Sequence, residues 1–326
     1  MKNLLKLSKL TFLLFVGFSI QSCSDDDDDV TTPTGPSNIV EIAMDTPDLS
    51  NLVAALSVAD GNLVDVLSGG EFTVLAPTNE AFETFLAANG FMSLSEVPTD
   101  VLSNILLNHV ISGTINSTNL VDAGSGYSTT NASNMDGDNL SLYFDTSSGV
   151  TFNGISSVVA ADIVASNGIV HVVDEVIGLP TVVTFAVSNP AFSTLVAALT
   201  TEGLSVDIVS ILSSSDEPSP FTVFAPTNDA FGSLLAELGL NALGDIPVDI
   251  LEATLGTHVA PEANVRSTDL VDGMSVNTIS STITVSLSDG AKLIDSNGRE
   301  SNIVAVDIQA YNGVVHVIDN VLLPQL

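Results

Sequence analysis

An internal repeat constrains this sequence more than any other feature. A ten-residue block occurs at 73–82 and again at 222–231, with eight positions identical. Three further blocks return in the same order: a histidine, a Ser-Thr-x-Leu-Val-Asp segment and an Asn-Gly-x-Val-His-Val-x-Asp segment. The offset between the copies stays between 145 and 150 residues. We therefore expect two homologous domains in tandem and not a solenoid of small units.

Helical patterns dominate the first half of each copy. In the first copy, apolar residues at helical spacing predict a helix over 48–67. Thr78 or Asn79 can cap a helix that follows the 73–82 block. Pro98 opens a further helix, whose apolar stripe includes His109.

Strand patterns dominate the second half. A short apolar strand over 72–76 precedes them, and residues 139–144 and 150–152 predict a hairpin. Residues 169–173 predict a closing strand. Because helices mostly precede strands, the predicted fold class is α+β.

The N-terminus has the pattern of an export signal. Three lysines surround the start of an apolar run over 10–20, and Cys23 follows shortly after it. A basic segment, a short apolar core and a small residue form a secretory signal that is removed, which predicts a signal peptide over 1–22. The placement of Cys23, the only cysteine, resembles the acylation site of bacterial lipoproteins. We expect lipidation of Cys23; the alternative is a plain secretory peptide with an incidental cysteine.

Residues 23–37 are predicted to form an extended tether. Five successive aspartates over 25–29 repel one another and stay solvated, and a Thr/Pro/Gly/Ser stretch follows. An acidic run behind a lipidated cysteine resembles the surface-export signal of Bacteroidetes lipoproteins, and a soluble spacer is the alternative. These resemblances predict an outer-membrane lipoprotein exposed at the cell surface. The internal repeat predicts the two domains over 38–181 and 182–326.

The charge of the chain argues against several classes of partner. After removal of the signal peptide, the chain has 39 acidic residues and only three basic residues, which are Arg266, Lys292 and Arg299. Such an acidic surface disfavours nucleic acid and anionic lipid as direct partners, so the membrane would be reached through the lipid anchor only. It fits cations, basic proteins or simple solubility in salt.

Catalytic and metal-binding motifs are missing from the sequence. The four histidines lack the H-E-x-x-H spacing, no G-x-S-x-G elbow occurs, and the only thiol is at the anchor. Residues 134–139 are rich in oxygen ligands and suit weak calcium binding, but they lack the distal glutamate of a calcium loop, and a hairpin turn is the alternative. We expect no enzyme, no metal site and no cofactor beyond such weak calcium binding.

The repeated blocks resemble the fasciclin domain. The Thr-Val-x-Ala-Pro-Thr-Asn-x-Ala-Phe block, a later histidine, an Asp-Ile pair and the Asn-Gly-x-Val-His-Val-x-Asp block follow the family's order in both copies. The resemblance implies two compact β-wedges of roughly seven strands packed with several helices, and extracellular adhesion or matrix association without catalysis. The residues that carry it are Thr73, Pro77, Thr78, Asn79, Phe82, His109, Asp162, Asn167, Gly168, His171 and Asp174, and then Thr222, Pro226, Thr227, Asn228, Phe231, His258, Asp307, Asn312, Gly313, His316 and Asp319.

The physical interpretation of these motif residues is mainly structural. The Asn-Gly pairs suit tight turns that need a positive φ, and the histidines lie on apolar faces, where a hydrogen-bonded core residue is expected. Asp174 and Asp319 are expected to accept backbone hydrogen bonds. The segment at the first histidine and the Asp-Ile pair are associated with integrin binding in animal members. Here Asn108 or Thr257 replaces the family's tyrosine before that histidine, which makes integrin-type binding doubtful.

The sequence therefore predicts a noncatalytic adhesion or matrix-association protein whose partner is an extracellular protein or glycan. One alternative is a glycan-binding module, which three tyrosines and no tryptophan disfavour. Another is a rigid envelope spacer, because 176–185 joins the copies with almost no flexible linker. Neither the ligand nor the oligomeric state follows from the sequence. We expect a partner-specific surface where the copies differ, at the 213–220 insertion and the three basic residues.

Overall fold

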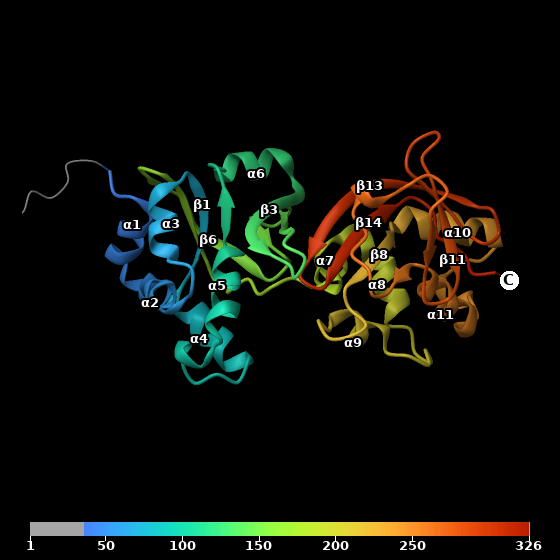
Figure 1. Cartoon of the computed structure of the whole chain (residues 1–326), viewed down its shortest axis with the longest axis horizontal. Coiled ribbons are helices and arrows are strands. Elements are labelled where there is room, and N and C mark those ends of the chain that lie inside the picture. The colour runs from blue at the N-terminus through green and yellow to red at the C-terminus, as the bar shows by residue number, and fades with distance from the viewer. Residues whose placement is uncertain (1–35, 326) are drawn as a thin grey trace, which may run out of the picture. The chain divides into compact units, whose positions relative to one another are not determined.

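Two successive copies of one α+β arrangement make up residues 36–325, which the computed structural model describes (Figure 1). The chain from Pro36 onward is a compact unit of its own. The predicted signal peptide, Cys23 and the acidic run lie outside the described residues.

The first copy begins with helices and ends with strands, as the sequence predicts. Its helices are α1 (Ile39–Asp45), η1 (Pro47–Leu49), α2 (Ser50–Val58), α3 (Leu63–Gly69), α4 (Asn79–Ala88), η2 (Leu94–Glu96), α5 (Thr99–Leu107) and α6 (Ser117–Ala123). Its strands are β1 (Phe72–Pro77), β2 (Val110–Ser112), β3 (Ser125–Ser133), β4 (Asn139–Asp145), β5 (Thr151–Phe152), β6 (Ser156–Ala165) and β7 (Gly168–Val173).

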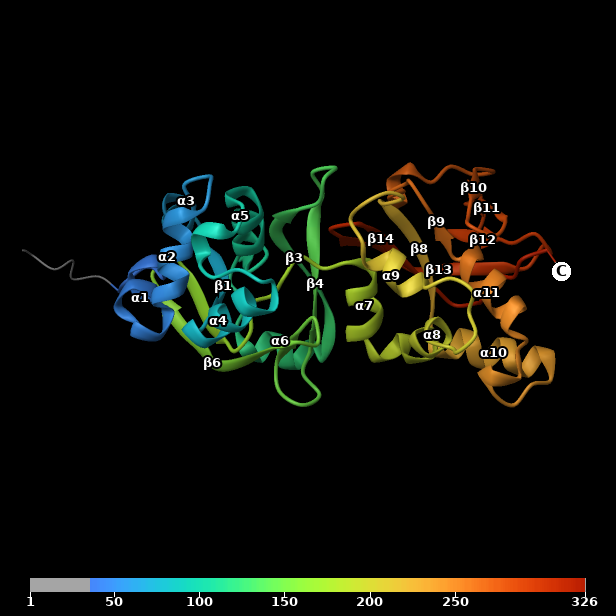
Figure 2. The same ribbon diagram turned by 90° about the horizontal axis from the view of Figure 1, so that it is seen from below.

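The seven strands of the first domain close into a barrel in chain order. Neighbouring strands are antiparallel, except that β1 and β7 pair in parallel from Phe72↔Gly168 to Pro77↔Val173. The link between β2 and β3 is a single pair, Ile111↔Thr130. Figure 2 shows the long hairpin of β3 and β4. The predicted 139–152 hairpin is confirmed, because Phe144 pairs with Phe152.

The second copy repeats this order with one difference in the sheet. Its helices are α7 (Val182–Ser188), η3 (Pro190–Phe192), α8 (Ser193–Leu199), α9 (Ile208–Ser213), α10 (Asn228–Leu238), η4 (Leu243–Asp245), α11 (Val248–Thr257) and η5 (Ser267–Asp269). Its strands are β8 (Phe221–Pro226), β9 (Val259–Ala260), β10 (Ser275–Asn277), β11 (Thr282–Ser286), β12 (Lys292–Ile294), β13 (Glu300–Ala310) and β14 (Gly313–Ile318). The sheet order is β10-β11-β12-β13-β14-β8-β9, so the sheet stays open between β9 and β10.

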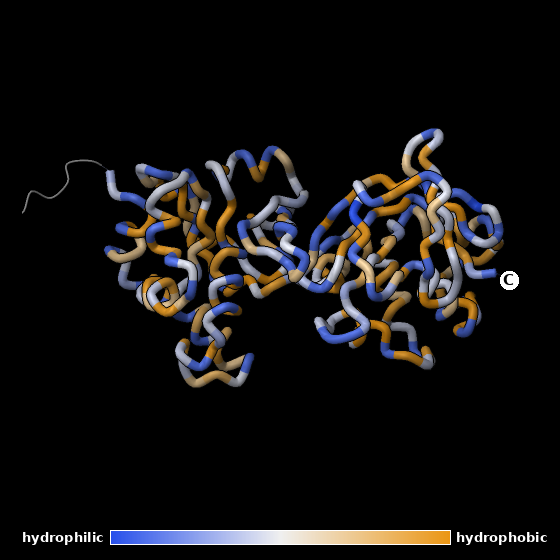
Figure 3. The backbone as a smooth tube through the Cα atoms, in the orientation of Figure 1, coloured by the Kyte–Doolittle hydropathy of each residue, from blue (hydrophilic) through white to orange (hydrophobic). Residues whose placement is uncertain are grey.

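Each domain buries its apolar residues between its helices and its sheet. Figure 3 shows the apolar residues concentrated in the strands and helices of each domain. Phe82 in α4 and Phe231 in α10, at equivalent places in the repeat, are each 1% exposed. Within residues 36–325 no single helix is long and apolar enough to cross a membrane, and two bent helix pairs reach that length and composition.

Local sequence signals set several of the helix ends. Thr78 is the N-cap of α4, and its hydroxyl accepts from the backbone N–H of Ala81 at 3.2 Å. The expected single helix over 48–67 is wrong, because the chain breaks between α2 and α3. Gly61 and Asn62 have φ values of +85° and +53° there, which a continuous helix does not allow.

Gly168 and Gly313 are required by the close approach of the first and last strands. Their φ values are +149° and +154°, so the positive φ predicted for the Asn-Gly turns is present. A Cβ on Gly168 would lie 1.9 Å from the carbonyl oxygen of Phe72, and one on Gly313 would lie 2.1 Å from that of Phe221. Only glycine allows the parallel ladder to form at these positions.

We predict that Gly168→Ala lowers the free energy of unfolding by at least about 3 kcal/mol, because the new Cβ forces β7 away from β1. Denaturant unfolding of residues 36–326 measures this. The matched control is Gly69→Ala at the end of α3, where a Cβ meets nothing within 4 Å. Equal stability of the two variants would contradict the prediction.

Candidate functional site

His109 and His258 are buried hydrogen-bonding residues. His109 follows the end of α5 and is 2% exposed; it lies just past the helix on which the sequence placed it. Its Nδ1 lies 2.8 Å from the Ile105 carbonyl oxygen, and its Nε2 accepts from the backbone N–H of Ile177 at 2.8 Å. These contacts require a neutral ring with its proton on Nδ1. They connect α5 to the segment that follows the last strand.

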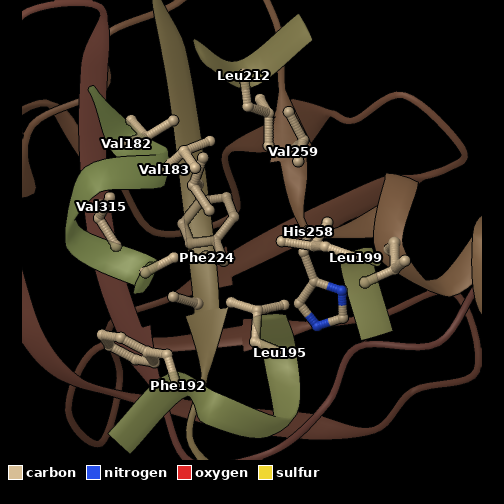
Figure 4. Close-up of a pocket in the computed structure, with 14 residues that line it drawn as sticks. Val182, Val183, Phe192, Leu195, Leu199, Leu212, Phe224, His258, Val259 and Val315 are labelled. Carbon is tan, nitrogen blue, oxygen red and sulfur yellow. The ribbon is translucent and has the colours of Figure 1, made fainter. Parts of the chain in front are cut away.

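His258 repeats this arrangement in the second domain. Its Nδ1 lies 2.8 Å from the Thr254 carbonyl oxygen, and its Nε2 accepts from the N–H of Leu322 at 3.0 Å. Figure 4 shows the ring among Leu195, Leu199 and other apolar side chains. The cavity beside it is only about 30 Å³, and the one beside His109 is about 20 Å³. Both are too small for a ligand of ordinary size.

His171 and Asp162 act together in the first domain. His171 donates from Nε2 to the Ile115 carbonyl oxygen at 2.9 Å and accepts on Nδ1 from the N–H of Asp162 at 3.2 Å. Asp162 has a φ of +60°, and its carboxylate accepts from both the backbone N–H and the hydroxyl of Ser117. The Ser117 contacts lower the pKa of Asp162. The aspartate of the Asp-Ile pair therefore fixes α6 against β6.

The second domain repeats this cluster with His316, Asp307 and Ser267. His316 lies 2.8 Å from the Val265 carbonyl oxygen and accepts from the N–H of Asp307 at 3.4 Å. Asp307 has a φ of +59°, and its carboxylate accepts from the N–H and hydroxyl of Ser267. Burial lowers the pKa of His316.

The side chains of Asn167 and Asn312 hold the first helix of each domain to its last turn. Asn167 accepts from the N–H of Ile39 at 2.9 Å and donates to the Leu67 and Gly70 carbonyl oxygens. Asn312 accepts from the N–H of Val182 at 2.9 Å. Each asparagine therefore joins segments about 100 residues apart or more.

The remaining polar motif residues also bind the protein's own backbone. Thr73 donates to Gly113 and accepts from Ile115, and Asn79 accepts from the N–H of Asn51. Asp174 accepts from Ser157, as the sequence predicts. The equivalent contacts in the second domain are Thr222 with Ala263 and Val265, Asn228 with Thr194, and Asp319 with Asn302. The motif residues thus fix the backbone through hydrogen bonds at several places in each domain. They do not converge on one site.

No group of three or more His, Cys, Asp or Glu side chains that could hold a metal occurs among the described residues. The oxygen-rich segment over 134–139 forms the turn of the β3–β4 hairpin. A hairpin turn was the alternative to weak calcium binding for this segment. There the Asn134 side chain accepts from the N–H groups of Asp136 and Asp138.

This hairpin turn contacts the second domain. Asp138 pairs with Arg266 at 2.7 Å and also accepts from Asn264. Asn134 donates to the Gln309 side chain, and the Ser141 hydroxyl accepts from the Gln309 N–H at 3.0 Å. The other two basic residues of the described chain pair within the second domain, Lys292 with Glu300 and Arg299 with Glu237. All three cations therefore have acidic partners inside the chain.

The segment between the domains is also held in place. The side chain of Asn108 donates to the Ile177 and Gly178 carbonyl oxygens, and the Tyr311 N–H donates to Pro180 at 2.7 Å. Tyr127 packs edge-on against Phe185 and accepts from Asn189 at 3.1 Å. The residues at the domain junction are not repeated in the other copy, so the internal repeat did not reveal them. The short connection over 176–185 was the sequence signal for a fixed junction.

The stability of the fold depends on pH through its buried imidazoles. Burial lowers the pKa of His109 and of His258 from 6.5 to about 4. Between these values the unfolded chain binds a proton that the folded chain does not bind. The free energy of unfolding therefore falls as the pH drops from 6.5 through 4, by up to ~3 kcal/mol for each ring. Equilibrium unfolding as a function of pH measures this slope.

His109→Gln should make the dependence of the unfolding free energy on pH shallower, because one titrating imidazole is removed. The variant should also be less stable at pH 7. The control is Thr130→Val, which removes a buried hydroxyl but leaves both rings in place. If the His109→Gln curve runs parallel to that of the unmodified chain, His109 does not titrate in this window.

Comparison with known proteins follows the same division into two domains. The family model of the Fasciclin domain matches residues 47–180 and 190–324. The pig protein named transforming growth factor-beta-induced protein ig-h3 is 30% identical over 257 residues, which are 78% of this chain and 35% of that protein. The cell surface glycolipoprotein MPB83 of Mycobacterium bovis is 45% identical over 94 residues, which are 25% of this chain and 41% of MPB83. The chain thus spans less than half the length of either relative.

A solved structure has the same fold. It is a FAS1 domain pair from the insect cell adhesion molecule fasciclin I, with a TM-score of 0.51 and 21% identity. The match covers 85% of this chain and 97% of that one. Two tandem α+β domains with seven-stranded sheets are therefore common to both.

Proposed function

This chain belongs to the Fasciclin domain family, whose members are noncatalytic adhesion and surface proteins, and on that basis we propose that it is a lipid-anchored adhesion protein of the bacterial cell surface. The observation that carries the proposal is the tandem pair of complete fasciclin domains. Their motif side chains bind the protein's own backbone and leave the outer surfaces for partners.

Attachment through Cys23 completes the proposal. A basic segment, an apolar run and a cysteine in succession support lipidation, and the aspartates over 25–29 support export to the outer face of a Bacteroidetes-type outer membrane. Lipidation places many copies on one surface, where weak contacts of each copy add up through avidity. The proposed partner is an extracellular protein or a glycan.

We predict that Cys23→Ala releases the protein from the membrane fraction and abolishes surface attachment and cell aggregation of the native strain. The two-domain fold should be unchanged, because Cys23 lies outside it. Membrane fractionation and an adhesion assay measure the two effects against a gene deletion. If the deletion leaves attachment and aggregation intact, adhesion is not the function; if Cys23→Ala stays in the membrane, the lipid anchor is wrong.

A glycan partner is the first alternative, and the structure offers it little aromatic surface. Tyr143 is 2% exposed, and Tyr127 packs against both Tyr143 and Phe185. Sugars commonly stack on exposed aromatic faces, which these two rings do not provide. A glycan array probed with residues 36–326 decides the matter, since uniformly blank results would remove this alternative.

A rigid spacer is the second alternative, and the junction supports it. Arg266 and Asp138 pair across the domains, and Gln309 adds two hydrogen bonds to the same hairpin. The linker carbonyl groups are bound from both sides, by Asn108 and by Tyr311. Such contacts hold two domains at a fixed angle better than a free linker does.

We predict that Arg266→Ala loosens the domain pair. The partly exposed ion pair contributes only about 0.2–1 kcal/mol, so the fold should persist while the spread of interdomain distances widens. Spin-label distance measurements between the two domains report this spread. The matched control is Lys292→Ala, which removes an ion pair within the second domain and should leave the distances unchanged. Identical distributions for both variants would show that the Arg266–Asp138 pair does not restrain the junction, and wide distributions in the unmodified chain would contradict a rigid junction.

A further inference from the structure

The second domain contains a groove that the adhesion proposal does not use. It has a volume of about 560 Å³ and lies between α9, α11 and the turn from β10 to β11. Its walls are mostly apolar, formed by Val206, Ile208, Ile211, Val248, Ala253 and Val259 among others. This volume and lining are typical of sites for small organic ligands.

The two copies differ in the residues of the helix that lines the groove. Gly256 in α11 takes the place of Leu107 in α5, which packs on the first domain's core. A Cβ at Gly256 would lie 2.1 Å from the Ser280 hydroxyl, so the turn packs directly on the helix. Ala253 takes the place of Asn104, whose amide binds both backbone groups of Ser133.

The turn between β10 and β11 lies at the same place. Val259 in β9 and the turn at Ile279 and Ser280 line the groove; the Ile279 N–H donates to the Val259 carbonyl oxygen at 2.9 Å, but β9 and β10 form no ladder. In the first domain, the pair Ile111↔Thr130 joins the equivalent strands and closes the barrel. The equivalent face of α5 in the first domain carries a pocket of about 330 Å³ lined by Asn104 and Leu107, so the second copy has a larger groove with a different lining.

The charged groups at the groove are all acidic. Asp249 and Glu252 line it, and its lining residues, all within the described chain, include no lysine or arginine. Glu252 accepts from the Ser205 N–H at 2.6 Å and from the Ser205 hydroxyl. The Ser205 contacts lower the pKa of Glu252, so its carboxylate remains charged at neutral pH. Each carboxylate oxygen keeps acceptor capacity for another donor.

We propose that this groove binds a small amphipathic cation, with an apolar chain between α9 and α11 and an ammonium group at Glu252. The apolar walls receive the chain, since burial of apolar surface drives such binding. The carboxylates exclude fatty acids and other anions, because like charges repel at the mouth of a partly apolar site. The ammonium group donates to the free lone pairs of Glu252.

Calorimetric titration of residues 36–326 with dodecylamine, below its micelle concentration and at pH 7, tests the proposal. We expect saturable binding of one dodecylammonium ion per chain, with dodecyl sulfate and dodecyl maltoside bound at least about tenfold more weakly. Ala253→Phe fills the groove and should abolish binding. Glu252→Gln removes the charge of an exposed carboxylate and should weaken binding about two- to fivefold.

The matched control is Glu83→Gln, an equal change of charge on exposed α4 of the first domain, and it should leave binding unchanged. Circular dichroism melting verifies that each variant is folded, and Glu252→Gln gives an independent result if Ala253→Phe does not fold. Undiminished binding to folded Ala253→Phe would overturn the proposal. So would equal binding of dodecyl sulfate, or unsaturable uptake that Glu83→Gln and Glu252→Gln reduce alike.

Discussion

Two neutral imidazoles, one in each domain, connect a helix to the segment that follows the last strand. A ring that donates from one nitrogen and accepts on the other can do both only without the second proton. His109 uses this property to join the end of α5 to Ile177, beyond the last strand, and His258 joins α11 to Leu322 in the same way. Since both rings are buried, a second proton would place a charge in the core and set the protonated Nε2 against a backbone N–H. The packing of α5 and α11 against the end of each domain depends on these rings.

The repeated and the unique positions of the chain have different roles. The repeated polar residues, such as Asn167 and Asn312, bind backbone groups far away in the sequence and so define the fold. The unique residues form what the two copies do not share, namely the Asp138–Arg266 junction and the lining of the groove beside Gly256.

Local patterns predicted much of the fold but little of its long-range pairing. The Thr78 cap, the 139–152 hairpin and the Asn-Gly turns follow from rules that involve a few neighbouring residues. Helix α1 was not predicted, although Asn38 and Glu41 form a capping box at its start. The break at Asn62 was not predicted either, because apolar residues at helical spacing continue on both sides of it.

The functional features were less predictable than the fold. The repeated polar residues were expected to have structural roles. Their hydrogen-bond partners, such as Ser117 for Asp162, lie tens of residues away in the sequence, and no sequence motif identifies them. The groove depends on side-chain volumes on two helices and a turn, and a single Gly256 in a helical pattern does not reveal it.

The parallel pairing of the first and last strands determines when each domain can fold. Leu75 in β1 lies opposite His171 in β7, and Phe224 in β8 lies opposite His316 in β14. Such distant pairs close large loops, so they form late and slowly during folding. In a chain that emerges with its N-terminus first, β1 lacks its parallel partner until residue 173 has emerged. Each domain therefore completes its sheet only after its last strand is available, and the first domain can do so before the second has emerged.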